Sequence, residues 1–188
     1  MQNSNQELNS TEQKAALKIA RQTLAATFNQ KPDKPATGEL PEIFSERRGA
    51  FVTLKKHGQL RGCIGIFEPD IPLSEVIKKM ALSAAFEDTR FEPLRAKELT
   101  DVEIEISVLS PMTKINSPDE IKLGVHGVYI KKGRQSGVFL PQVATEMNWD
   151  KETFLNTLCE EKAGLPQNCW KDSSSELYIF TAQVFGEK

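Results

Sequence analysis

The sequence predicts an α+β fold with a mostly antiparallel sheet flanked by helices. Two observations lead to this prediction. Two pairs of short apolar segments are each joined by a brief turn, as in β-hairpins, and helical stretches separate these pairs instead of alternating regularly with single strands. The chain has 188 residues, of which 39% are hydrophobic and 27% charged, so it is long enough to bury a sizeable core.

The first element expected is a helix that begins at Ser10. Ser10 and Gln13 have the spacing of a capping box, and apolar residues follow at helical intervals as far as Phe28. Residues 1–9 are polar and predict a flexible tail without a basic, apolar leader, which makes the cytoplasm the expected location. The proline-rich residues 29–41 predict a surface loop.

The next element is a hairpin formed by residues 49–55 and 60–66, with the turn at 56–59. Its second strand contains the hexapeptide Leu-Arg-Gly-Cys-Ile-Gly, residues 60–65. Because side chains alternate along a strand, Arg61 and Cys63 are expected to project together from one face. Gly62 and Gly65 predict a bulge, a bend or a surface that a ligand or another backbone approaches closely.

The rest of the chain continues the pattern of hairpins and helices. Apolar residues at helical spacing predict a helix over residues 73–86, and alternation predicts a strand over 102–109 whose outer face is acidic. Pro111 to Gly124 is expected to be a loop with at most one helical turn. A second hairpin is expected from residues 126–131 and 137–140, then a short helix after Pro141, a helix from Asp150 to Gly164, and a strand over 177–185.

Two candidate chemistries centre on the hexapeptide. In the first, Cys63 is a nucleophile whose thiolate is stabilised by Arg61 and whose general base is His126; the alternative is a cysteine that only packs. In the second, Arg61 and Arg90 bind a carboxylate or phosphate. The alternative is a pair of structural ion pairs, Arg61 with Glu103 or Glu105 and Arg90 with Asp88.

The carboxylates Asp88, Glu103 and Glu105 could act as an acid–base pair or as oxygen ligands, but no spacing typical of a metal site supports them, and no metal is expected. Three widely separated cysteines signal neither a disulfide framework nor a structural zinc site. The sequence points to no particular cofactor.

Nucleic-acid binding is a further alternative. A net charge of −2 argues against a dedicated duplex binder. Basic residues at the two hairpin tips could contact phosphates, although the sequence shows no helix-turn-helix, zinc finger or aromatic stacking platform. These basic residues are Lys55, Lys56, Lys131, Lys132 and Arg134.

Several segments stand out in their order along the chain. They are Gly49-Ala-Phe-Val-Thr-Leu, the hexapeptide at 60–65, Asp88-Thr-Arg-Phe-Glu-Pro-Leu, Glu105-Ile-Ser-Val-Leu-Ser, Ser136-Gly-Val-Phe-Leu-Pro-Gln-Val, and Lys162-Ala-Gly-Leu with Trp170. In this order they resemble the AMMECR domain, whose microbial members are called AmmeMemoRadiSam system protein A. The resemblance runs from about residue 13 to residue 185 and implies a single domain over 1–188 with a larger and a smaller lobe, interleaved along the chain.

The same resemblance implies a cleft near the hexapeptide and a place for each site residue. It puts Arg61, Gly62, Cys63 and Gly65 at the site, matches Asp88 and Arg90 to an Asp-x-Arg-Phe stretch, and matches His126 to a His-Gly pair. The system name implies partnership with a Memo-type protein and a radical-SAM enzyme. The chain is then expected to be an enzyme component of a modification pathway, or else a non-catalytic module that presents RNA or a protein partner.

Overall fold

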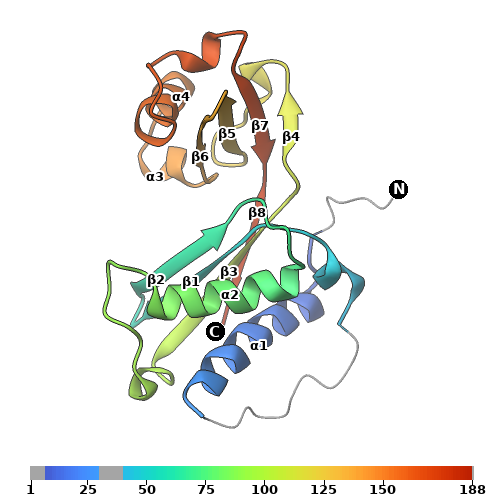
Figure 1. Cartoon of the computed structure of the whole chain (residues 1–188), viewed down its shortest axis with the longest axis vertical. Coiled ribbons are helices and arrows are strands. Elements are labelled where there is room, and N and C mark those ends of the chain that lie inside the picture. Colours follow the sequence, from blue (N-terminus) through green and yellow to red (C-terminus); the bar gives the residue numbers. More distant parts are fainter. Residues whose placement is uncertain (1–6, 30–39, 188) are drawn as a thin grey trace. The chain divides into compact units, whose positions relative to one another are not determined.

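A computed structural model describes residues 7–29 and 40–187, and these divide into two units, each with its own sheet (Figure 1). Each unit also has its own hydrophobic core. The first unit comprises Met1–Leu109 and Gln183–Lys188, and the second comprises Ser110–Ala182. The chain thus leaves the first unit once and returns to it with its last strand. Within the described residues, no helix combines the length and the apolar character needed to cross a membrane.

The first unit is a four-stranded sheet with two long helices packed on it. The strand order is β2-β1-β3-β8, and β1 pairs antiparallel with both β2 and β3. Helix α2 packs on β1 and β2, while α1 packs on β3 and on α2. Alternate residues of the strands therefore pack against the helices. The bounds are α1 Ser10–Thr27, β1 Ala50–Lys56, β2 Gln59–Ile66, α2 Leu73–Phe86, β3 Val102–Leu109 and β8 Ala182–Gly186, with 3-10 turns at Glu42–Ser45 (η1) and Ala96–Glu98 (η2).

The second unit is a four-stranded antiparallel sheet in the order β4-β7-β5-β6, with short helices on one face. Its core joins alternate residues of the strands to the helix residues Phe154, Leu155 and Leu158. The bounds are β4 Thr113–Ile115, β5 Gly127–Lys132, β6 Gln135–Phe139, α3 Val143–Glu146, α4 Lys151–Thr157, a π-helical turn η4 Leu158–Lys162 and β7 Glu176–Phe180, with 3-10 turns at Pro118–Glu120 (η3) and Cys169–Lys171 (η5).

The α+β prediction is confirmed, and so are both hairpins, the helix over 73–86 and the strand over 102–109. The turn between β1 and β2 has positive φ at His57 and Gly58, which matches the right-handed twist of the strands that it joins. The predicted surface loop at 29–41 falls mostly outside the described residues.

Three predicted elements differ from the structure. The last strand is divided at Thr181 into β7 and β8, which belong to different sheets, and the expected loop after Pro111 contains the short strand β4. The capping box of α1 consists of Asn9 and Glu12, one residue earlier than predicted. Leu8 is buried in the core and its N–H donates to the Gln183 side chain, so the predicted flexible tail does not extend to this residue.

Candidate functional site

The two glycines of the hexapeptide serve the packing of the first unit. Gly62 is buried, and a Cβ built on it would lie 2.1 Å from the Ala84 carbonyl oxygen, so its bare backbone lets α2 lie close to β2. Gly65 is covered by the Phe51 ring from the neighbouring strand, where an added Cβ would meet ring carbons at 2.2 Å. Neither glycine is therefore free to let a ligand approach on the side where its side chain would be, contrary to the interpretation of Gly62 and Gly65 as ligand contacts.

Cys63 lies at the outer edge of the sheet, since β2 is the first strand in the order. Its N–H donates to Asp88 Oδ2 at 2.9 Å, and its carbonyl oxygen accepts from Arg90 Nη2 at 3.2 Å. Both backbone groups of Cys63 thus point away from β1, so Cys63 and its partner Thr53 are a non-hydrogen-bonded pair. In such a pair the two side chains lie close together. Thr53 Oγ1 lies 3.2 Å from Cys63 Sγ, and the free thiol is half-buried.

Asp88 and Arg90 close this edge as one rigid unit. Arg90 donates through Nε to Asp88 Oδ1 at 2.9 Å and through Nη2 to Oδ2 at 2.7 Å. The Asp88 side chain is 4% exposed and that of Arg90 56%. The hydrogen bond from Arg90, together with those from the backbone of Cys63 and Arg90, outweighs burial and holds the pKa of Asp88 well below its usual range. The predicted ion pair between Arg90 and Asp88 is confirmed.

Arg61 does not share the surroundings of Cys63. The β1–β2 register shifts after Leu54, whose partner is Gly62, so that Lys55 pairs with Leu60 and Arg61 is left as a bulge. The Arg61 guanidinium donates to both oxygens of Glu98, at 3.2 and 3.1 Å, and both side chains are only 14% exposed. The expectation that Arg61 and Cys63 emerge side by side as a functional pair is therefore wrong, because the bulge interrupts the alternation and Glu98 binds the guanidinium.

The other predicted site residues differ in their relation to Cys63. Glu105 is the register partner of Thr53, which is also the partner of Cys63, so Glu105 lies in the same cross-strand row as the thiol. Glu105 pairs with Lys55 at 2.8 Å and not with Arg61, and Glu103 is exposed. His126 belongs to the second unit, where its Nδ1 accepts from the Lys122 N–H at 3.2 Å, whereas Cys63 belongs to the first unit. Across residues 7–29 and 40–187, no three His, Cys, Asp or Glu side chains are grouped as metal ligands would be.

The second unit contains a disulfide, which corrects the expectation that the cysteines signal none. Cys159 and Cys169 are bonded, with Cα atoms 5.9 Å apart and a sequence separation of 10, and both are buried. The bond joins the π-helical turn η4 to the 3-10 turn η5. Trp170 and Lys171 follow Cys169 directly, so the disulfide fixes the segment that supplies them.

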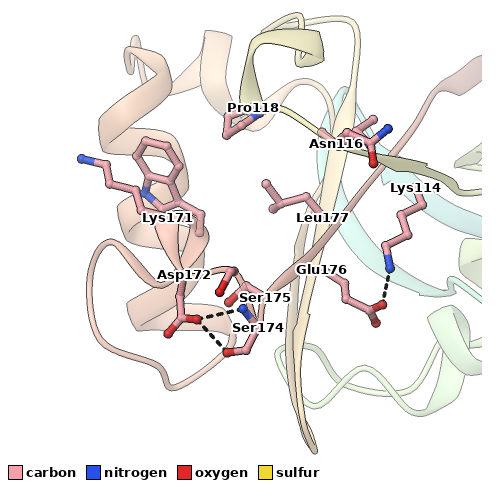
Figure 2. A pocket seen from close by; sticks show the side chains of 12 residues that line it. Lys114, Asn116, Pro118, Lys171, Asp172, Ser174, Ser175, Glu176 and Leu177 are labelled. Carbon is pink, nitrogen blue, oxygen red and sulfur yellow. Dashed lines mark hydrogen bonds and ion pairs between the residues drawn. The ribbon is translucent and has the colours of Figure 1, made fainter.

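These two residues form one wall of a pocket of about 660 Å³ (Figure 2). Ile115 and Leu177 line it with apolar surface, whereas the turn of Asp172 to Ser175 and the strand residue Glu176 line it with polar groups. The charged groups around it are paired: Lys114 with Glu176, Lys132 with Asp172, and Lys171 with Glu152. The pocket therefore offers hydroxyl and amide groups rather than an excess of one charge. Its lining comes from residues 114–118 and 170–177, distant in sequence and without a recognisable motif.

Reduction of the disulfide is expected to destabilise the second unit by about 2–3 kcal/mol, because the bond closes a loop of about ten residues in the unfolded chain. Urea unfolding with and without reductant measures this difference. A Cys63→Ala variant should respond to reductant as the wild type does, since Cys63 is the free thiol. Equal stability of the oxidised and reduced proteins would contradict the expectation.

Comparisons with known proteins agree with the fold and with the family resemblance. The AMMECR1 family model matches residues 17–185. A protein of Methanothermobacter thermautotrophicus is 42% identical over 186 residues, covering 96% of each chain, and one of Nanoarchaeum equitans is 45% identical over 177 residues, covering 90% of this chain and 97% of its own. The crystal structure of an uncharacterized protein from Pyrococcus horikoshii superposes with a TM-score of 0.80 at 35% identity, covering 96% of this chain and 94% of that one. The chain belongs to the AMMECR1 family.

Proposed function

We propose that the chain binds an anionic group of its substrate at Arg90, beside the Cys63 thiol, as a component of a modification pathway. The AMMECR likeness implies the company of a Memo-type protein and a radical-SAM enzyme in that pathway. The main support for an anion site is the hydrogen bonding of the Arg90 guanidinium. Asp88 and the Cys63 carbonyl hold it through Nε and Nη2, and within the described part of the chain Nη1 has no hydrogen-bond partner.

Arg90 suits this role better than Arg61. A guanidinium fixed along one edge loses little rotational freedom when a carboxylate or phosphate binds its other edge. The Arg90 side chain is 56% exposed, whereas the Arg61 side chain is 14% exposed and both its bonds go to Glu98. The charge of Arg61 is thus already satisfied by Glu98, whereas the Arg90 guanidinium contacts Asp88, lies 5.6 Å from the centre of the Phe91 ring and is still open to solvent.

The role of the thiol separates two forms of this proposal. In the enzymatic form, Cys63 reacts with a substrate whose anionic group Arg90 positions. In the alternative form, the chain is a non-catalytic module that presents RNA or a protein partner, and Cys63 only contacts it. A Cys63→Ser variant should lose turnover in the enzymatic form and should keep binding in the alternative form.

The anion site can be tested without knowing the substrate, by comparing two alkylating reagents at Cys63. Iodoacetate is anionic and iodoacetamide is neutral, and Cys63 is the free cysteine of the folded chain. Attraction by Arg90 should favour iodoacetate, so Arg90→Gln is expected to lower the ratio of the iodoacetate rate to the iodoacetamide rate by about two- to fivefold at low salt. Labelling is followed at neutral pH by mass spectrometry of the intact native protein.

Arg61→Gln is the matched control, because it removes the same charge two residues from Cys63 but from a guanidinium bound to Glu98. It should leave the rate ratio close to that of the wild type. Inorganic phosphate should slow iodoacetate labelling in the wild type and not in Arg90→Gln. A rate ratio that is unchanged in Arg90→Gln, or that falls equally in both variants, would refute an anion site at Arg90.

A further inference from the structure

The sheet of the second unit has one face covered by helices and another that carries both tyrosines of the chain. Val128, Ile130 and Leu177 point into the core with the helices. Because side chains alternate, Tyr129 and Tyr178 lie on the other face, and both are half-buried. They occupy β5 and β7, the two central strands of the order β4-β7-β5-β6.

Strand register places the two tyrosines side by side. Tyr129 is the direct partner of Tyr178, and their ring centroids are 5.9 Å apart with a tilt of 54° between the rings. The row continues to Lys114 on β4 and to Val138 on β6, so it crosses all four strands. Lys114 Nζ lies 6.0 Å from the centre of the Tyr178 ring. We call this row of Lys114, Tyr178, Tyr129 and Val138 the tyrosine row.

Basic side chains accompany the tyrosine row. The strands of this sheet and the β5–β6 turn carry Lys114, Lys131, Lys132 and Arg134 against the single acid Glu176, and Lys131 and Arg134 are exposed. Acidic side chains also lie in the helical segments and turns of this unit, among them Glu146, Glu152, Glu160, Glu161 and Asp172, and so do the cations Lys151, Lys162 and Lys171. Lys114 is paired with Glu176 and Lys132 with Asp172, so Lys131 and Arg134 are the cations of this sheet that form no ion pair within the described residues.

Phe180 bounds the tyrosine row on one side, and the pocket adjoins the row on the β4 side. At the β7–β8 junction Phe180 lies on the same face, is buried and covers Gly127 with its ring, so the accessible aromatic surface begins at the tyrosines. At the β4 side, Lys114 and Glu176 also line the 660 Å³ pocket (Figure 2).

We infer that the tyrosine row binds single-stranded nucleic acid, with bases stacked on Tyr129 and Tyr178 and phosphates near Lys131 and Arg134. Aromatic rings on the central strands of an antiparallel sheet, with cations beside them, are the arrangement by which proteins hold unpaired bases. A duplex keeps its bases stacked on one another, so it cannot use the rings in this way. The inference concerns the second unit and is independent of the anion site at Arg90.

The test measures fluorescence anisotropy of fluorescein-labelled ten-nucleotide oligouridine and oligoadenosine, and of a duplex of the same length, with the full chain. We expect saturable binding of the single strands and weaker binding of the duplex. Tyr178→Ala should weaken single-strand affinity by about fivefold to one hundredfold, the loss associated with one base–aromatic stack, and Tyr129→Ala should do the same. Tyr178→Phe and Tyr129→Phe keep the ring and should stay within about twofold of the wild type.

Charge variants give a second measurement. Lys131→Ala should reduce the slope of log affinity against log salt by about 0.7, the change expected for one phosphate contact on a single strand. Lys78→Ala is the matched control, because it removes a charge from an exposed ion pair on α2 of the first unit, and it should leave the slope unchanged. Circular dichroism of each variant confirms that the fold is kept.

Three results would overturn the inference. The first is no saturable binding of either single strand by the wild type at low salt. The second is equal affinity for single strand and duplex. The third is an equal loss in the Tyr→Phe and Tyr→Ala variants, which would mean that the hydroxyl groups and not the ring faces are recognised, as at a contact with another protein.

Discussion

Gly62→Val should destabilise the first unit by about 3 kcal/mol or more, because overpacking of this kind forces backbone to move. An ideal Cβ at this position would lie 2.1 Å from the Ala84 carbonyl oxygen, and the neighbouring carbonyl carbon is 3.1 Å away. Both atoms belong to the backbone of α2, so no side-chain rotation can relieve the clash. Helix α2 would have to move away from β2, and the core between the helix and the sheet would open.

Urea unfolding measures this loss, and Gly186→Ala is the control. A Cβ on Gly186, on the edge strand β8, would have its nearest neighbour at 3.3 Å, so this substitution should cost well under half as much as Gly62→Val. The disulfide of the second unit allows the two units to be told apart, since reductant should affect only the second. A Gly62→Val protein as stable as the wild type would show that the hexapeptide glycine is not required by packing.

The elements that sequence patterns predicted correctly are those set by local periodicity. The helix over residues 73–86 has buried residues at helical spacing, and the strand over 102–109 has strict alternation, and both have the predicted bounds. Each pattern is complete within its own segment. The capping box of α1 was misplaced by one residue because Asn9 and Ser10 are both good N-cap residues and have an acceptable N3 residue, Glu12 or Gln13.

The features that were missed depend on partners distant in sequence. Residues 177–185 alternate as one strand would, but the break at Thr181 follows from the existence of two sheets, which no local pattern reveals. The disulfide joins residues whose separation resembles no motif. The tyrosine row brings together Tyr129 and Tyr178, which the sequence shows as single aromatic residues, and the sequence therefore gave no sign of a stacking platform.

At the candidate site, some of the residues that the sequence pattern singled out lie together in the structure and others do not. Asp88 and Arg90 were recognised through their motif, and the structure shows why they stand together: they satisfy the backbone of Cys63 on an edge strand that would otherwise offer unpaired groups there. Alternation paired Arg61 with Cys63, but a bulge of one residue cancels that inference. Bulges cannot be deduced from alternation, because they are exceptions to it.

The ion pair between Glu98 and Arg61 should make the first unit sensitive to acid. Hydrogen bonds from Arg61, and then from the Arg95 backbone and Lys56, outweigh burial and lower the pKa of Glu98 from 4.5 to about 2. A carboxyl group whose pKa is lower in the folded than in the unfolded protein stabilises the fold. This stability is fully present at a pH above the pKa of the unfolded state, and it is lost as the pH falls through the pKa of the folded state. The pair should therefore contribute up to about 3 kcal/mol above pH 4.5, lost on acidification toward pH 2.

Glu98→Gln tests this contribution, since the amide has nearly the same shape and does not titrate. The free energy of unfolding, measured by urea at pH 5 and at pH 2.5, should fall less between these values in the variant than in the wild type. Part of the decrease in the free energy of unfolding should persist in the variant, because the pKa of Asp88 is lowered as well. Glu103→Gln, at an exposed position of the adjacent strand β3, should keep the full pH dependence. If Glu98→Gln keeps it too, the bonds between Glu98 and Arg61 contribute no net stability, and the guanidinium becomes available for an anion after all.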